Sequence, residues 1–208
     1  PDVKVAIELI GGLEPARSIV LQLLESGKDV VTANKALLAE HGAELFNRAR
    51  KLGRSIAFEA SVGGGIPIIA AIGQCLSANQ IRSIHAILNG TSNYILTQME
   101  SGMSYADALA DAQKLGYAEA DPTGDVEGFD AAGKVVILAR LLMNEQISME
   151  EVDRTGISGL SVDDVNAAKA AGERWKLIGS LERVDEKLVA SVKPQRLPLS
   201  HPLAGVGG

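Results

Sequence analysis

Hydrophobic and polar positions in the first third of the chain alternate between two patterns. Residues 3–11 (VKVAIELIG) and 29–33 (DVVTA) are short runs rich in β-branched residues, which are typical of buried strands. Between them, apolar residues recur at helical spacing, which predicts a helix that begins at Pro15 and ends at Gly27. The chain therefore opens with a strand, a helix and a second strand.

The same alternation continues with a helix over 35–53, ending at Gly53, and a strand over 55–60 (SIAFEA). Strands separated by helices of this length predict right-handed βαβ units. We expect an α/β fold with a parallel sheet and helices on both faces, corresponding to the second half of a doubly wound, Rossmann-type domain.

The turn that opens a dinucleotide-binding sheet is not in this sequence. Such a sheet starts with a strand and a GxGxxG turn, whose glycines let the backbone approach a pyrophosphate. No GxGxxG occurs in the 208 residues, which begin with Pro1 and stop at Gly208 within an apparent loop. We therefore expect an internal fragment of a longer protein.

The pattern changes after residue 60, and we expect a domain boundary between about residues 60 and 80, with an α+β domain beyond it. Gly63–Gly65 favour a turn, and Pro67 lies in the first turn of the next helix. Pro194 and Pro198 should confine the last strand to a sheet edge or end it. The expected elements are a helix over 66–78, a strand over 81–90, helices over 92–102 and 105–115, a long helix continuing beyond residue 130, a helix and a strand within 162–184, and a strand over 188–198.

Composition describes an ordinary globular protein, with 46% hydrophobic and 22% charged residues. A net charge of −6 argues against nucleic acid or an anionic membrane as a partner. No targeting segment or membrane span is evident, so we expect a cytoplasmic protein. The single Cys75 cannot form an internal disulfide, and its neighbours predict a buried helix position. The three histidines are far apart and give a zinc site little support.

The segment from Gly116 to Lys134 (GYAEADPTGDVEGFDAAGK) combines an acidic loop with the start of a helix. A lone lysine ends it, four residues after Asp130. Such a segment is a candidate for recognising an amine and moving a proton. The carboxylates that precede the lysine are Glu119, Asp121, Asp125, Glu127 and Asp130.

An acid and a lysine at this spacing on a helix ordinarily form a solvent-exposed pair of little energetic value. Here, however, apolar residues further along the helix continue the stripe on which Asp130 and Lys134 lie. The pair should therefore lie at the polar end of a buried face, where the lysine is partly desolvated and better suited to proton transfer. The apolar residues of the stripe are Ile137, Leu138, Leu141 and Leu142.

Five motifs, in this order, resemble those of homoserine dehydrogenase. They span nearly the whole chain: VVTANK (30–35), EASVGGGIP (59–67), LNGTSNY (88–94), Gly116–Lys134 and HPLAGV (201–206). The resemblance implies an NAD(P)-dependent oxidoreductase that interconverts L-aspartate 4-semialdehyde and L-homoserine in threonine, methionine and isoleucine biosynthesis. It also implies a homodimer formed through the second domain. Residues 1–65 would be a partial NAD(P)-binding Rossmann domain and residues 66–208 a partial substrate-binding catalytic domain.

The same resemblance assigns chemistry to the acidic segment. Lys134 matches a lysine that gives a proton to the carbonyl oxygen, and Asp130 and Glu119 match acids that hold the substrate. These roles suit the local chemistry, because carboxylates bind an α-ammonium group by charge-assisted hydrogen bonds. A lysine can also stabilise and then protonate the oxygen that gains charge during hydride transfer. Further candidates for substrate binding are Tyr117, Thr91 and Asp125.

Cofactor and cation sites also follow from the resemblance. Lys35 matches a lysine beside the nicotinamide, Gly116 matches a backbone contact to the cofactor, and Gly11 lies in a turn that passes close to it. The carboxyl end of a strand, where Lys35 lies, is independently where ligands bind in an open α/β sheet, although Asn34 and Lys35 could simply begin a helix. A monovalent cation site for sodium is implied at Glu59, Val62, Gly64 and Ile66, whose oxygens suit a hard cation.

Two other hypotheses remain open on the sequence. One is another amino-acid dehydrogenase with a similar two-domain layout, which need not carry the acidic segment. The other is a non-catalytic binding or assembly module that keeps the fold. For the leading hypothesis we expect the 208-residue chain alone to be inactive, because it lacks the phosphate-binding turn.

Overall fold

A computed structural model describes residues 2–207, which form two compact units. Unit 1 contains the described residues up to Ile81 together with Val136–Met149. Unit 2 contains Arg82–Val135 and the described residues from Glu150 onward. The expected domain boundary between residues 65 and 66 stays a prediction, because compactness alone does not say which ligand a segment binds.

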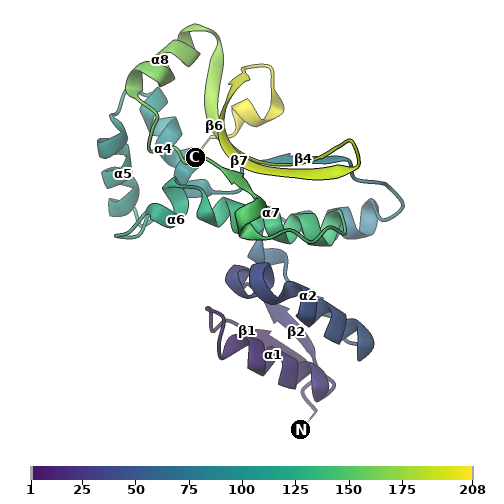
Figure 1. Cartoon of the computed structure of the whole chain (residues 1–208). Helices are drawn as coiled ribbons and strands as arrows, with labels where there is room; N and C mark the ends of the chain where they lie inside the picture. Colours follow the sequence, from purple (N-terminus) through teal and green to yellow (C-terminus); the bar gives the residue numbers. More distant parts are fainter. Residues whose placement is uncertain (1, 208) are drawn as a thin grey trace. The chain divides into compact units, whose positions relative to one another are not determined.

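Unit 1 is built on a three-stranded parallel sheet (Figure 1). Its strands lie in the order β1, β2, β3, so each new strand is added on the same side of the previous one. This confirms the predicted α/β class with a parallel sheet. The bounds are β1 Val5–Glu8, α1 Ala16–Glu25, β2 Asp29–Thr32, α2 Lys35–Lys51 and β3 Ile56–Ala57.

The two faces of this sheet differ in burial. Glu8, Val30 and Thr32 are each no more than 2% exposed, whereas Ile7 on the opposite face is 69% exposed. Two right-handed crossovers that advance in the same direction place both helices on the same face, and α1 does contact α2. The prediction of helices on both faces is therefore not met within residues 2–207, whose other sheet face is open.

The segment after β3 is less regular than predicted. Only two of the residues 55–60 form a strand, and a 3₁₀ turn, η1 (Glu59–Ser61), follows. The next helix begins directly after Pro67 as α3 (Ile68–Ala70) and continues as a π-helical turn, η2 (Ala71–Cys75). Cys75 is exposed, so its predicted buried position is wrong. None of the residues 63–80 is buried, so the apolar neighbours of Cys75 do not cover it.

Unit 2 contains a mixed four-stranded sheet in the order β4, β6, β7, β5. Long antiparallel strands β6 and β7 form a hairpin whose turn residues, Asp185 and Glu186, both have positive φ, as a tight hairpin requires. The bounds are β4 Ser83–Ala86, β5 Asp153–Arg154, β6 Glu173–Val184 and β7 Lys187–Pro198.

The prolines of β7 lie where the sequence predicted. Strand β5 pairs with β7 only at Ser191 and Val192, so from there onward β6 is the only strand paired with β7. Pro194 therefore occupies an edge position, where it lacks no necessary donor. Pro198 is the last residue of the strand, so the predicted edge and end are both confirmed.

Helices of unit 2 begin at side-chain caps. Asn89, Ser104 and Ser161 accept hydrogen bonds from backbone amides at the starts of α4, α5 and α8. The short α6 lies within the acidic segment, where no helix was predicted. No helix among residues 2–207 is long and apolar enough to cross a membrane. The bounds are α4 Gly90–Glu100, α5 Tyr105–Lys114, α6 Thr123–Val126, α7 Phe129–Leu142, α8 Val162–Ala170, η3 Met149–Glu151 and η4 Pro202–Gly205.

Candidate active site

The acidic loop of unit 2 is fixed by contacts to its own neighbours. Gly116 has a φ of +81°, which lets the chain turn immediately after α5. The Gln113 side chain then donates to the carbonyl of Glu119 at 3.0 Å. Asp121 accepts from the amide of Thr123 at 3.1 Å at the start of α6. The loop therefore reaches α7 along a defined path.

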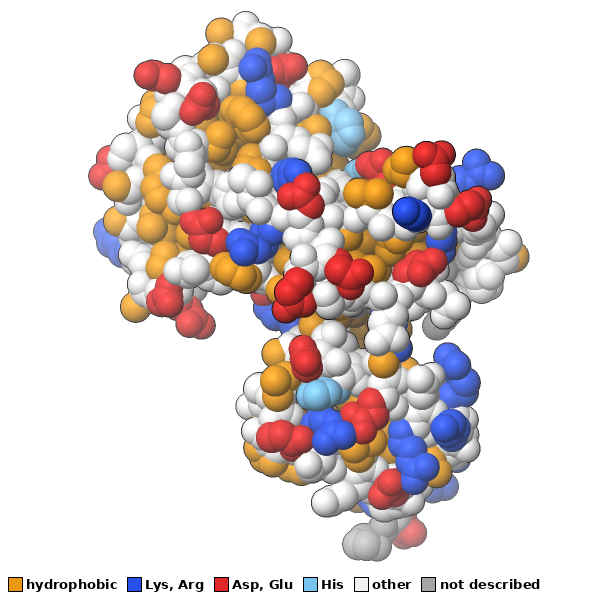
Figure 2. Space-filling model, in the orientation of Figure 1, with side chains coloured by type: hydrophobic (Ala, Val, Ile, Leu, Met, Phe, Trp, Pro, Cys, Tyr) orange, Lys and Arg blue, Asp and Glu red, His pale blue; other side chains and the backbone are white. Residues whose placement is uncertain are grey.

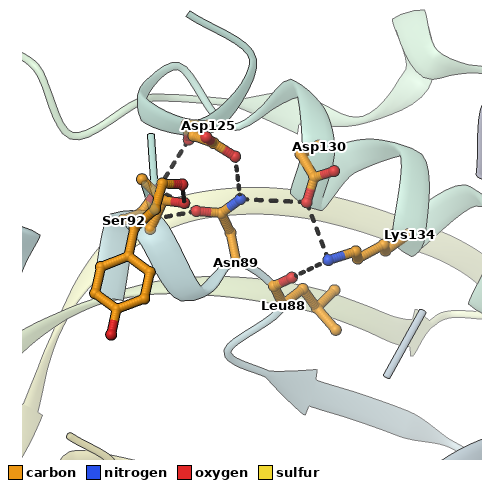
Figure 3. Close-up of polar contacts among 8 residues, drawn as sticks. Leu88, Asn89, Ser92, Asp125, Asp130 and Lys134 are labelled. Atoms are coloured by element: carbon orange, nitrogen blue, oxygen red, sulfur yellow. Dashed lines mark hydrogen bonds and ion pairs between the residues drawn. The ribbon is translucent and has the colours of Figure 1, made fainter. Parts of the chain in front are cut away.

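Lys134 and Asp130 form a partly buried ion pair on the first two turns of α7. Their Nζ and Oδ2 atoms are 3.0 Å apart, and each side chain is only 14% exposed. Lys134 also donates to the carbonyl of Leu88 at 2.6 Å, just before α4 (Figure 3). A solvent-exposed surface pair would not have this burial or this third partner. Two of the three ammonium donors are thus directed into the protein, and one remains.

Asn89 joins two of the carboxylates (Figure 3). Its Nδ2 donates to Asp125 at 2.6 Å and to Asp130 at 3.2 Å, while its Oδ1 caps α4 by accepting from the amide of Ser92 at 2.8 Å. A neutral amide thereby holds two like charges near the lysine. No role was predicted for Asn89 from the sequence, although it lies within the LNGTSNY motif (88–94).

The hydroxyl of Thr91 anchors the loop, since it donates to the carbonyl of Tyr117 at 2.8 Å. The Tyr117 side chain is exposed, and its ring lies 5.0 Å from that of Tyr94. A 2.6 Å hydrogen bond to Asp111 fixes Tyr94 and raises the pKa of Tyr94 to about 12. Thr91 therefore supports the loop, and Tyr117 is a side chain that a ligand could meet.

The acids of the segment do different things. Asp125 and Asp130 share Asn89, whereas Asp121 accepts from the amide of Thr123 and Glu127 accepts from the Ser158 hydroxyl. Glu119 is exposed, and none of the described contacts of the Asn89–Asp130–Lys134 cluster involves its side chain. The structure thus brings together Asp125, Asp130 and Lys134, with Glu119 at the surface of the same loop.

The predicted cofactor residues of unit 1 follow the carboxyl ends of adjacent strands. Gly11 has a φ of +79° in the turn after β1, and Lys35 is the first residue of α2, just after β2. Because β1 and β2 are parallel neighbours, both turns lie at the same sheet edge. This edge is the ligand-binding edge of open α/β sheets.

Within the predicted cation site, Glu59 already has partners. Its two carboxylate oxygens accept from the amides of Ile69 at 2.7 Å and Ala70 at 2.9 Å, so it caps α3. The carbonyl of Ile66 accepts from the amide of Ile68 at 2.8 Å. Oxygen atoms of this kind can still ligate a hard cation through their remaining lone pairs. No group of three or more His, Cys, Asp or Glu side chains suited to a metal occurs within residues 2–207.

A parallel sheet whose strand ends can bind a nucleotide, and a lysine–carboxylate cluster suited to proton transfer, fit an oxidoreductase that uses a nucleotide cofactor. Sequence comparisons identify the family. The model for homoserine dehydrogenase matches residues 67–208, and the model for the homoserine dehydrogenase NAD binding domain matches residues 1–59. The chain belongs to the homoserine dehydrogenase family.

Individual relatives agree with this assignment. Homoserine dehydrogenase of Corynebacterium glutamicum is 47% identical over 99% of this chain and 47% of its own length. The Bacillus subtilis enzyme is 47% identical over 99% of this chain and 48% of its own. The chain thus spans about half the length of the curated relatives it matches.

Solved structures agree as well. A homoserine dehydrogenase from Thiobacillus denitrificans has a TM-score of 0.95 and 45% identity, covering 100% of this chain and 48% of that one. A homoserine dehydrogenase from S. aureus has a TM-score of 0.86 and 43% identity, covering 98% of this chain and 51% of that one.

Proposed function

We propose that the protein of which this chain is a part interconverts L-aspartate 4-semialdehyde and L-homoserine with NAD(P), in threonine, methionine and isoleucine biosynthesis. The observation that carries the proposal is the partly buried Lys134–Asp130 pair, which lies in an acidic cluster of unit 2. Family membership supplies the substrate class. The cluster supplies the two functions that this substrate needs, recognition of an ammonium group and proton transfer at a carbonyl.

The carboxylates recognise the amino-acid end of the substrate in this proposal. Asp125 and Asp130 are held together by Asn89, and Glu119 extends the negative surface of the same loop. Tyr117 adds an exposed aromatic hydroxyl, and Thr91 fixes the backbone beneath it. A permanent α-ammonium group satisfies such a cluster by charge-assisted hydrogen bonds.

Lys134 then handles the proton. When bound, the nicotinamide cofactor gives a hydride to the carbonyl carbon of the substrate or takes one from it. Lys134 donates to the Leu88 carbonyl and pairs with Asp130, which orients its remaining N–H. That N–H stabilises the negative charge that develops on the carbonyl oxygen and delivers the proton in the reductive direction.

Several finer assignments belong to the same proposal. Gly11 and Lys35 of unit 1, and Gly116 of unit 2, contact the cofactor. Sodium binds among the oxygens of Glu59, Val62, Gly64 and Ile66, a donor set of one carboxylate and three carbonyls. The full-length protein is a homodimer through the domain that contains unit 2. Analytical ultracentrifugation tests the homodimer, and activity measured in sodium-free buffer tests the sodium site.

The deciding experiment uses Lys134→Ala in the full-length protein. Turnover should fall by about 10²–10⁴-fold, the typical contribution of a positioned acid or base, while the melting temperature and homoserine binding largely persist. The matched control is Lys187→Ala, an exposed lysine next to the hairpin turn of unit 2, which should leave turnover unchanged. Wild-type turnover in Lys134→Ala would remove this lysine from the mechanism.

A non-catalytic binding module makes a different prediction for the same protein. It would bind ligands without homoserine-dependent reduction of NAD(P), whatever residue occupies position 134. The 208-residue chain alone gives a second test, since we expect no turnover from residues that contain no GxGxxG turn. Robust homoserine oxidation by this chain would contradict that expectation.

A further inference from the structure

Glu8 is a buried acid that none of the roles above uses. It is the last residue of β1, and it is only 2% exposed on the helix-covered face of the sheet in unit 1. A carboxylate in such a place is costly unless hydrogen-bond donors surround it. The hydrogen-bond donors around Glu8 therefore indicate its structural role.

Hydrogen bonds link Glu8 to both βα turns of unit 1. Its Oε1 accepts from the amides of Ile10 at 2.7 Å and Gly11 at 3.2 Å, in the turn after β1. Its Oε2 accepts from the hydroxyl of Thr32 at 2.6 Å, at the end of β2. One carboxylate thus contacts the starts of both turns.

Asn34 connects the same two turns by a second set of hydrogen bonds. Its amide donates to the Thr32 hydroxyl oxygen at 3.0 Å, and its side chain donates to the carbonyl of Gly12 at 2.8 Å. Its Oδ1 also caps α2 by accepting from the amide of Leu37 at 3.1 Å. Hydrogen bonds therefore form a closed network that joins Glu8, the first turn, Asn34 and Thr32.

The protonation state of Glu8 fits this arrangement. Burial raises the pKa of Glu8, but the hydrogen bonds from Thr32 and from the amides of Ile10 and Gly11 outweigh it and hold the pKa below the ordinary value of 4.5. Glu8 is thus an anion near neutral pH. Its charge is used inside the protein, because both oxygens have donors.

We propose that Glu8 is a positioning residue for cofactor binding, which locks the Leu9–Gly12 turn to the turn that begins α2 at Lys35. The two turns are then already ordered before the cofactor binds, so binding does not have to meet the entropic cost of ordering them. Because the amides of Ile10 and Gly11 point to Glu8, they are not available to a phosphate. This inference rests on the proposed function.

The test is Glu8→Gln in the full-length protein, with the Kd of NADPH measured by fluorescence titration. Glutamine has one acceptor oxygen in place of two, so it cannot accept both from the turn amides and from the Thr32 hydroxyl. We expect the Kd of NADPH to rise about tenfold, as loss of one buried charge-assisted hydrogen bond implies. The KM for homoserine should stay within about twofold, because its binding groups are in unit 2.

Two controls keep the test decisive. Glu44→Gln removes an exposed carboxylate of the same unit, paired with Arg17, and should leave the Kd of NADPH unchanged. If Glu8→Gln does not fold, Thr32→Val and Thr32→Ser replace it. Valine removes the hydroxyl and should raise the Kd, whereas serine keeps it and should not.

A wild-type Kd in folded Glu8→Gln, or equal values for the two Thr32 variants, would overturn the inference. So would a loss of homoserine affinity as large as the loss of cofactor affinity, since that is the result of a general structural defect. The proposed function fails separately, if the wild-type full-length protein shows no homoserine-dependent reduction of NAD(P).

Discussion

The two units each hold a buried charge next to a proposed ligand site, and they use it differently. Glu8 in unit 1 is 2% exposed, and both of its oxygens accept hydrogen bonds from the protein. Lys134 in unit 2 is 14% exposed and keeps one donor beyond its contacts with Asp130 and Leu88. Burial alone therefore does not identify a reacting group. In the proposed mechanism, the donor that Lys134 keeps for the substrate distinguishes it from Glu8, whose two oxygens both accept hydrogen bonds from the protein.

The largest expected effect is at the ion pair of unit 2. Asp130→Asn removes the charge that orients Lys134, so kcat should fall by about 10²-fold or more. In the double variant Asp130→Asn/Lys134→Ala, the losses should not add, because the two residues act as a unit. Steady-state kinetics of the four proteins in this cycle measure the coupling. Fully additive losses would mean that the two side chains act independently.

The next largest effect is expected for substitutions of Asn89, and two variants distinguish its role as a helix cap from its role as a bridge between carboxylates. Asn89→Ala loses the cap of α4 and the bridge between Asp125 and Asp130, which should cost about 1–2 kcal/mol of stability and raise the KM for homoserine about tenfold. Asn89→Asp keeps a cap acceptor but adds a third carboxylate. It should therefore recover stability only in part and keep the high KM. Denaturant unfolding and kinetics test both variants, with the exposed Asn79→Ala as a control.

Lys176 is a second buried lysine of unit 2, and the comparison predicts that it resembles Glu8 more than Lys134. Its Nζ donates to Asn93 at 2.9 Å and to the carbonyl of Val206 at 2.7 Å, which leaves one of its three donors, as at Lys134. Lys176 is, however, only 2% exposed, so that donor is not accessible to a substrate. Lys176→Met keeps the volume but leaves these acceptors unpaired. It should cost about 1–3 kcal/mol of stability and leave kcat nearly unchanged. A large loss of kcat with little loss of stability would break the comparison.

The pH dependence of the same variant has a defined sign. Burial, opposed by Glu100 and assisted by Arg174, lowers the pKa of Lys176 from 10.5. Between the folded and unfolded pKa values the unfolded chain binds more protons, so this lysine makes stability rise with pH toward 10.5. Lys176→Met should remove that contribution. Urea unfolding of both proteins across the alkaline range measures it.

The smallest expected effect is on how the free energy of unfolding changes at acid pH. The pKa of Glu8 is lowered in the folded protein, so its contribution is fully present above the ordinary value of 4.5 and is lost as the pH falls through the folded pKa. Glu8→Gln should make stability fall less steeply below pH 4.5. Unfolding free energies measured between neutral and acid pH, for this variant and for Glu44→Gln, provide the test. Equal slopes in wild type and Glu8→Gln would contradict it.

Figure 2 shows that charged side chains of both signs are scattered over the visible face. Several Lys and Arg side chains lie close together at the lower right of this view, although the chain as a whole has a modest net charge of −6. Composition gave this general property. It could not say which charges are used inside the protein.

Elements with strong local signals were predicted well. The helices over 15–27 and 35–53 and the strand ended by Pro198 correspond to α1, α2 and β7. The predictions failed where local spacing was weak or misleading, as at the two-residue β3 and at the exposed Cys75 in its π turn. The open sheet face of unit 1 also differed, because helix position depends on strand order, which local periodicity does not contain.

Within the site, the spacing of Asp130 and Lys134 on one helix was sufficient to predict their pairing, and motif order was sufficient to predict the family. The hydrogen-bond partners of the buried polar side chains, in contrast, are far away in the sequence and are brought close only by folding. Leu88 is 46 residues from Lys134, Asn89 is 36 from Asp125, and Thr32 is 24 from Glu8. Periodicity describes neighbours within a few residues on one helix or strand, whereas burial and satisfied hydrogen bonds are properties of chains brought together in space. For this reason the pairing of Asp130 with Lys134 could be predicted from the sequence, and the residues that hold the pair in place could not.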